Sequence, residues 1–243
     1  MTYGNRLRVT SAAAALVLLA AFGLAFFSAQ IEADQGFSQK IFYVHVPLAI
    51  VALGGFVFGA VMAVAHLRTG DARYDLRSYV AIHLAIVLGV GALITGAIWA
   101  KAAWGVWFEW REPTLVSFLI VFLLYCTYQP MRFSIEDPDK QSRYASVFAI
   151  TAGAFVPLNF LAVRLADPYI HPRVLNQGGG DLPASFRPPF YLALVGMTLL
   201  FAALYQYELS HKNARTQMRQ LRRKLGGEVE ATSRSAAPQV TGT

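Results

Sequence analysis

Long apolar stretches alternate with short polar segments along the whole of this chain. Each stretch is close to the about 20 residues that an α-helix needs to cross the hydrocarbon core of a bilayer. The pattern predicts six transmembrane helices, over residues 11–29, 41–67, 78–100, 114–129, 144–165 and 189–208. The fourth stretch is the shortest, so its ends are the least defined.

Composition supports the same fold class. Of the 243 residues, 56% are hydrophobic and only 14% are charged, which is outside the range of soluble domains. We therefore expect an all-α, polytopic membrane protein. The sequence has no P-loop, Gly-rich dinucleotide motif or Cys/His zinc spacing. We expect a protein that is not an enzyme.

The distribution of basic residues predicts the orientation in the membrane. With the N-terminus in the cytoplasm, fifteen of the 21 Lys and Arg residues lie on the cytoplasmic side and six on the other. Positive residues are retained on the cytoplasmic side. Both termini are therefore predicted to be cytoplasmic, and the segments at 30–40, between the third and fourth helices, and at 166–188 are predicted to face outward.

The C-terminal residues form a second predicted region. We divide the chain into a six-helix domain at 1–210 and a basic cytoplasmic tail at 211–243. The part of the tail over 211–225 is expected to be a helical extension that contacts anionic lipid, and not a nucleic-acid-binding element. After Gly226 the composition predicts disorder.

All four tryptophans lie in the outward segment between the third and fourth helices, or on the helix end that leads into it: Trp99, Trp104, Trp107 and Trp110. Tryptophan has a large rigid apolar face, so such a cluster either anchors the protein at the interface or stacks on a planar ligand. An aromatic belt usually spreads over several helix ends, whereas these residues belong to one loop.

The predicted topology divides the five histidines. His66 and His211 lie beside cytoplasmic basic segments and are expected to be solvated. His83 is inside the third helix and is expected to be packed, so we leave it out of the site. His45 and His171 lie on the same outward side as the tryptophans. Two neutral imidazoles from separate segments are able to ligate haem iron from both faces.

Haem also requires an apolar platform and cations for its propionates. The aromatic candidates are Trp104, Trp107, Phe108 and Trp110. The cationic candidates on the outward side are Lys40, Lys101, Arg111, Arg164, Arg173 and Arg187.

Three segments resemble the CcmC-type haem-handling membrane proteins of cytochrome c maturation, which carry a Trp-rich outward loop. They are Gln-Lys-Ile-Phe-Tyr-Val-His-Val-Pro at 39–47, Trp-Gly-Val-Trp-Phe-Glu-Trp at 104–110, and the His-Pro pair at 171–172. The first is the most specific. The resemblance covers roughly residues 1–210.

This resemblance implies a multi-pass protein of the cytoplasmic (inner) membrane that transiently holds b-type haem at the outer face. His45 and His171 are then the axial ligands, and Trp104, Trp107, Phe108, Trp110 and Arg111 contact the haem. It further implies transfer to a periplasmic haem chaperone, beside a small single-helix accessory subunit and ABC transporter subunits.

The loop departs from the family pattern Trp-Gly-x-Trp-Trp-x-Trp-Asp at two positions. Phe108 replaces a tryptophan and keeps the aromatic face, while Arg111 stands where the family has an aspartate. Glu109 or Glu112 is able to replace that carboxylate, and Arg111 to meet a propionate instead.

Two other functions are compatible with the sequence. A membrane-bound b-type cytochrome would be expected to bury its histidine ligands between helices, where His83 is the only internal candidate. A transporter without haem would use the Trp-rich loop only as an interfacial anchor.

Overall fold

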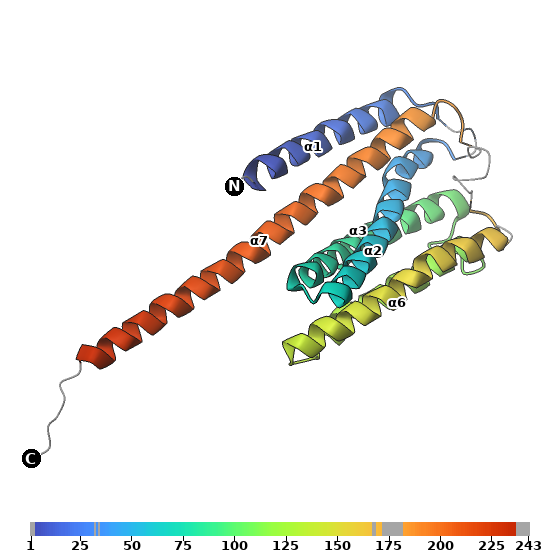
Figure 1. Ribbon diagram of the computed structural model, residues 1–243. Coiled ribbons are helices and arrows are strands. Elements are labelled where there is room, and N and C mark those ends of the chain that lie inside the picture. Colours follow the sequence, from blue (N-terminus) through green and yellow to red (C-terminus); the bar gives the residue numbers. More distant parts are fainter. Residues whose placement is uncertain (1–2, 32, 34, 167–168, 172–181, 237–243) are drawn as a thin grey trace, which may run out of the picture.

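The computed structural model describes residues 3–31, 33, 35–166, 169–171 and 182–236 (Figure 1). The described backbone contains helices and no β-strand. The helices are α1 (Tyr3–Phe27), the 3₁₀ helix η1 (Phe37–Ile41), α2 (Phe42–Thr69), α3 (Ala72–Trp104), α4 (Pro113–Cys126), α5 (Tyr128–Phe133), α6 (Pro138–Leu165) and α7 (Arg187–Ala236).

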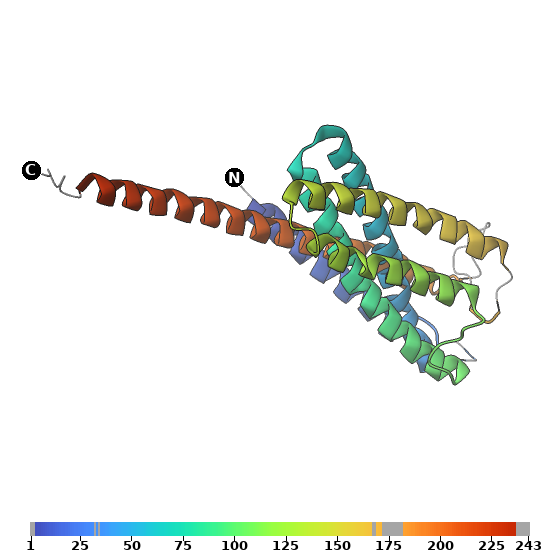
Figure 2. The ribbon, with the colours of Figure 1, turned by 90° about the horizontal axis from the view of Figure 1, so that it is seen from below.

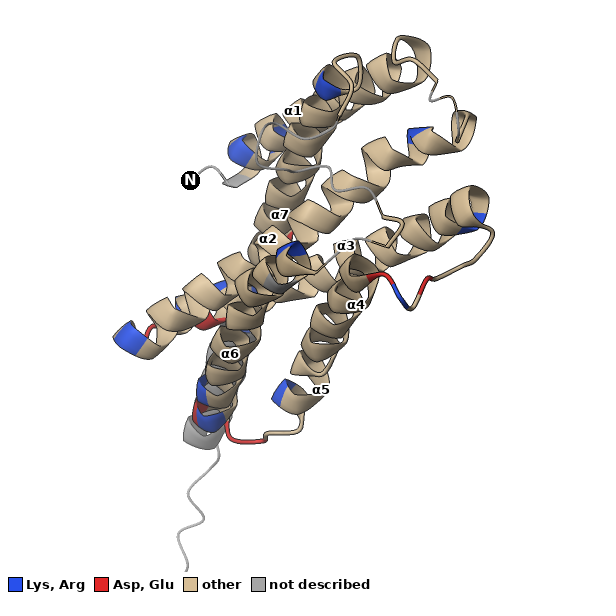
Figure 3. Ribbon diagram, turned by 90° about the vertical axis from the view of Figure 1, so that its right-hand side faces the viewer, with Lys and Arg blue, Asp and Glu red and all other residues tan. Residues whose placement is uncertain are grey.

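Six helical spans in the described part of the chain are long and apolar enough to cross a membrane, with α4 and α5 forming one span together. The predicted all-α fold with six transmembrane helices is confirmed. Figure 3 shows charged residues mainly at helix ends and in the connecting segments. This distribution leaves the helix middles apolar, as lipid requires.

The helix boundaries extend the predicted ones. The fourth span continues through α5 to Phe133, and α3 begins at Ala72, well before the predicted start at 78. Asp71 explains the early start, because its carboxylate accepts a hydrogen bond from the backbone N–H of Arg73 at 2.8 Å and so caps the helix. Gly70, with φ of 69°, ends α2 in the left-handed conformation that glycine adopts without strain.

The C-terminal region is helical over 211–225, as expected, and differs from the expectation only after Gly226. Helix α7 continues without a break across residues 210 and 211 and reaches Ala236, ten residues beyond Gly226, where we expected disorder to begin. The sequence from 190 to 237 contains no proline, the residue type that breaks a helix interior most strongly, so the helix is able to continue. Figure 2 shows α7 projecting far past the other helices.

Helix α2 lies in the middle of the bundle and packs against α3, α6 and α7, whereas α1 packs along α7 on one side (Figure 1). Small residues permit these contacts. A Cβ at Gly59 of α2 would lie 2.6 Å from Ile82 Cγ1 of α3, and a Cβ at Gly153 of α6 would collide with Ala60 of α2. Such small residues allow helices to approach closely in lipid, where the hydrophobic effect does not drive association.

The middle of the bundle is held by aromatic packing between helices. The rings of Phe56 (α2) and Tyr125 (α4) are stacked with centroids 3.8 Å apart. They belong to a buried cluster that also includes Ile82 and Ala149 and so joins α2, α3, α4 and α6. The same four helices line the cavity described below, so the packing of this cluster holds the walls of that cavity together.

The three segments predicted to face outward meet at one end of the bundle. Trp99 Nε1 at the end of α3 donates a hydrogen bond to Gln35 Oε1 at 2.8 Å, and the backbone N–H of Tyr169 donates to Glu112. A buried aromatic cluster beside them includes Phe42 and Phe190. The sequence therefore predicted correctly that these segments share one end; their placement outside the membrane stays a prediction.

Lys40 is a structural residue of this end. Its side chain is only 2% exposed, and Nζ donates hydrogen bonds to the carbonyls of Ala25 at 2.7 Å and Ala29 at 2.5 Å. Ala25 lies in the last turn of α1 and Ala29 two residues beyond its end, a place where backbone acceptors lack helical partners and a cation is favourable. Of the six cationic candidates, Lys40 therefore has its ammonium group bound to the end of α1.

We predict that Lys40→Met destabilises the protein by about 2 kcal/mol or more, because two buried carbonyls lose a charged donor. Lys101→Met is the matched control. The Lys101 Nζ donates to the Gly105 carbonyl from an exposed position, so its loss is expected to cost no more than about 0.5 kcal/mol. Thermal unfolding in detergent measures both, and equal midpoints for the two variants would contradict the role of Lys40.

Candidate functional site

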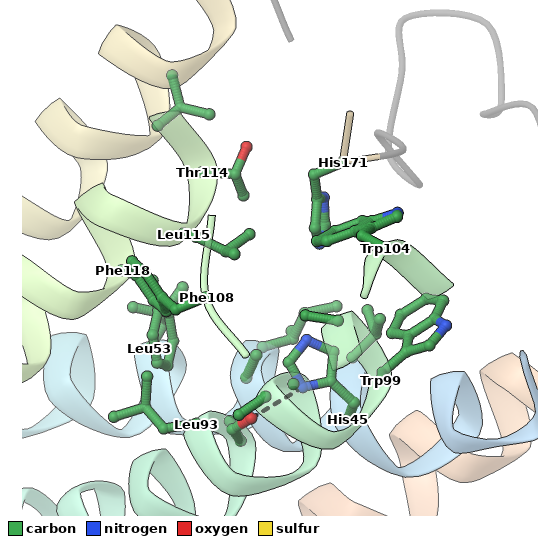
Figure 4. A pocket seen from close by; sticks show the side chains of 18 of the residues that line it. His45, Leu53, Leu93, Trp99, Trp104, Phe108, Thr114, Leu115, Phe118 and His171 are labelled. Atoms are coloured by element: carbon green, nitrogen blue, oxygen red, sulfur yellow. Dashed lines mark hydrogen bonds between the residues drawn. The ribbon is translucent and has the colours of Figure 1, made fainter. Parts of the chain in front are cut away.

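A cavity of about 250 Å³ lies at the end of the bundle where these segments meet (Figure 4). One water molecule needs only about 10–15 Å³ of such volume, so the cavity is of ligand size. Its walls come from α2, α3, α4, α6, the Trp-rich loop and His171. The lining is predominantly apolar.

Helix α2 places His45 at one side of the cavity. The residue lies in the first turn of the helix, and its Nδ1 is 2.9 Å from the backbone carbonyl of Ala92 in α3. A carbonyl only accepts hydrogen bonds, so this contact assigns the proton to Nδ1 and leaves the lone pair on Nε2. Figure 4 shows the second ring nitrogen directed away from that carbonyl, toward the cavity. A neutral imidazole in this tautomer is prepared to ligate a metal.

Gly96 allows the ring of His45 to lie against α3. A Cβ at this position would be 2.6 Å from Cε1 of His45 and 3.2 Å from Nδ1. Trp99, one helical turn later, contacts the same ring edge-on with centroids 5.8 Å apart. The backbone and side chains of α3 therefore fix the imidazole in one orientation.

His171 lies on the other side of the cavity, beside Trp104 (Figure 4). The two rings make an edge contact with centroids 6.1 Å apart. The structure thus brings together two histidines, His45 and His171, that are separated by about half of the chain. Residues 172–181, which include Pro172 of the His-Pro pair and the candidate Arg173, lie outside the described residues.

The sequence named Glu112 only as one of two possible replacements for the aspartate of the family pattern. The side chain of Glu112 is fully buried. Oε2 accepts hydrogen bonds from the backbone N–H groups of Tyr169, Ile170 and His171 at 3.0, 3.0 and 3.1 Å, and Oε1 accepts one from Thr114 at 3.2 Å. Burial opposes ionisation, but these backbone donors outweigh it, and the pKa of the Glu112 carboxyl is lowered.

The aromatic candidates divide into two groups. Trp104, Trp107 and Phe108 line the cavity, as does Trp99, which the sequence did not place among the site residues. Trp110 is outside the lining and 71% exposed, although its ring contacts Phe108 with centroids 4.6 Å apart. The loop turns at Gly105, whose φ of 76° ends α3, so neighbours in sequence face different directions.

Arg111 also lies outside the cavity lining. Its Nε donates to Glu109 Oε1 at 3.0 Å, and its guanidinium lies over the ring of Tyr169, 4.5 Å from the centroid. The structure therefore pairs Arg111 with a carboxylate of its own loop instead of directing it into the cavity. Among the described cationic candidates, Arg164 of α6 is the one in the lining.

The remaining histidines have contacts away from the cavity. His66 Nδ1 is 3.1 Å from the carbonyl of Asp71, His83 Nδ1 is 2.8 Å from Gln129 Nε2, and His211 stacks on Tyr207. The described residues contain no group of three or more His, Cys, Asp or Glu side chains that is suited to hold a bare metal ion. The two cavity histidines therefore suit a metal that brings its other ligands with it.

Comparisons with known proteins identify the family of this chain. The family model described as "Heme exporter protein C" matches residues 2–224. Proteins of that name from Paracoccus denitrificans and Rhodobacter capsulatus are 34% and 32% identical to this chain, over 70% and 84% of it and over 71% and 84% of their own lengths. A Marchantia polymorpha protein named as a putative cytochrome c biosynthesis ccmC-like mitochondrial protein is 27% identical, over 72% of this chain and 74% of its own. The chain belongs to the heme exporter protein C family.

Proposed function

We propose that this protein handles haem in cytochrome c maturation by holding it in the cavity between His45 and His171. The observation that carries the proposal is the placement of these two imidazoles on opposite sides of one apolar cavity (Figure 4). The hydrogen bond from His45 Nδ1 to Ala92 supports it, because it leaves Nε2 available for iron. The family name of the relatives refers to haem, which agrees with this chemistry.

The rest of the lining suits a macrocycle. Trp104, Trp107 and Phe108 provide flat aromatic surface, and Phe118 of α4 adds to the apolar wall. Arg164 is the described cation beside this surface and is our candidate for a propionate. In this proposal haem is a b-type cargo, bound without a covalent link and released again.

The exposed aromatic residues suit a site from which cargo is passed on. Trp107 is 61% exposed while it lines the cavity, so one residue contacts both the interior and the surroundings. We propose that the site faces the periplasm and that haem passes to a periplasmic chaperone. ABC transporter subunits and a small single-helix subunit are the further proposed partners in the cytoplasmic membrane, and the protein itself is not an enzyme.

A b-type cytochrome is less well supported. His83, the internal candidate, is hydrogen-bonded to Gln129 and stacked on Tyr79, and it is absent from the cavity lining. A transporter without haem leaves the convergence of His45 and His171 unexplained.

The first prediction separates the histidines by position. Replacing His45 or His171 with alanine is expected to remove or shift the Soret band of the haem-loaded protein, because iron loses an axial ligand. The matched controls are His66→Ala and His211→Ala, which are expected to keep the parental spectrum. Equal haem content and equal spectra in all four variants would contradict the proposed site.

A second prediction concerns Gly96. Gly96→Ala is expected to displace the ring of His45 and weaken haem binding about tenfold, since overpacking of this kind costs about 1–3 kcal/mol. Gly54→Ala in α2 is the control, because a Cβ there meets nothing within 4 Å. Haem titration followed by absorbance measures both, and unchanged affinity in Gly96→Ala would show that the close approach to His45 is unimportant.

A third prediction distinguishes the two groups of tryptophans. Trp104→Ala removes aromatic area from the lining and from the contact with His171, so haem affinity is expected to fall by about tenfold. Trp110→Ala is expected to change affinity less than about threefold, because the residue is outside the lining. Titration of both variants tests this, and a larger loss for Trp110→Ala would reverse the assignment.

A further inference from the structure

The carboxylate of Glu112 joins two segments that are far apart in the sequence. Glu112 precedes α4, directly after the Trp-rich loop, and its three partners at 169–171 follow α6. Three successive N–H groups converge on one oxygen, Oε2. Successive backbone N–H groups directed at one point form an anion-binding concavity, which the side chain of Glu112 occupies here.

The same carboxylate is held from its own side. Oε1 accepts the N–H of Thr114 at the start of α4, so the group caps this helix while it binds the other segment. The side chain is fully buried, which protects its hydrogen bonds from competition by water. Glu112 is thus a fixed point at the start of α4 to which the backbone of His171 is bound.

From these contacts we infer that Glu112 is the positioning residue for His171: it holds that imidazole over the cavity, opposite His45. The inference rests on the proposed function. Glu112 is not proposed to contact haem, because its carboxylate is hydrogen-bonded to the backbone N–H of His171. In this respect His171 depends on a side chain of another segment, whereas His45 is fixed by its own helix and by α3.

Glu109 provides a contrast within the same loop. Its carboxylate binds the backbone N–H and the side chain of Arg111, two residues away, and accepts none of the three hydrogen bonds from the backbone at 169–171. Its link to that segment is indirect, through the Arg111 guanidinium over the ring of Tyr169. Removing the Glu109 carboxylate loosens Arg111 but leaves the three backbone hydrogen bonds from 169–171 to Glu112, so the segment is expected to stay in place. Glu109→Ala is therefore a matched control for Glu112→Ala.

The test uses the full-length protein in detergent with a nitroxide spin label at residue 170, in Ile170→Cys with Cys126→Ser. Ile170 is 37% exposed, so a label is tolerated there, and Cys126 is the one native cysteine. Without haem, Glu112→Ala is expected to increase the mobility of the label, and Glu109→Ala is not. Glu112→Gln, which keeps the shape and one acceptor oxygen, is expected to give a smaller increase and guards against a folding defect.

Haem-loaded protein without the label supplies the second readout. Glu112→Ala is expected to convert the six-coordinate spectrum toward that of His171→Ala and to weaken haem binding about 10- to 100-fold, the usual effect of losing a group that orients a ligand. Unchanged label mobility, or a mobile label with a parental spectrum, would overturn the positioning role. If His171→Ala itself leaves the spectrum unchanged, the proposed function fails, and the label still reports whether Glu112 holds the segment.

Discussion

The need to satisfy every backbone polar group inside lipid governs this molecule. Within the hydrocarbon region only regular helices achieve this along a single segment, so irregular backbone is confined to the ends of the spans. The candidate site lies where α2 begins, α3 ends, α4 begins and α6 ends. A cavity at the ends of the spans is lined both by apolar helix surface and by connecting segments, and these segments contribute the aromatic residues and His171.

The two histidines of the cavity are fixed by different means. His45 is part of a helix, and a backbone carbonyl and a glycine of the neighbouring helix set its tautomer and orientation. His171 is outside any helix, and its backbone is bound by a buried carboxylate. One imidazole on a helix and one on a connecting segment held by a single side chain are consistent with the proposed binding and release of haem.

The spans and the placement of His45 and His171 on a common side were predictable because both follow from local information, whereas their role as haem ligands stays a prediction. Apolar runs report helices directly, and the count of basic residues places segments on a common side. Contacts between distant segments were not predictable in this way. The bond from Glu112 to His171 spans 59 positions, and the sequence offered only a choice between Glu109 and Glu112 as the replacement for a missing aspartate.

The direction of individual side chains was also not predictable from the sequence. From its residue type and position, Lys40 is expected to be a solvated interfacial cation, but its side chain turns back to the end of α1 and is buried. Trp110 and Arg111 are close to lining residues in sequence, yet the turn at Gly105 and the pair with Glu109 direct them elsewhere. Such outcomes depend on local backbone geometry that residue type alone does not specify.

The most direct test of the central claim is an experimental structure of the haem-loaded protein, determined by cryo-electron microscopy. We expect iron between Nε2 of His45 and the imidazole of His171, with His45 Nδ1 still hydrogen-bonded to the carbonyl of Ala92. Haem bound elsewhere, or iron without either histidine as a ligand, would contradict the claim.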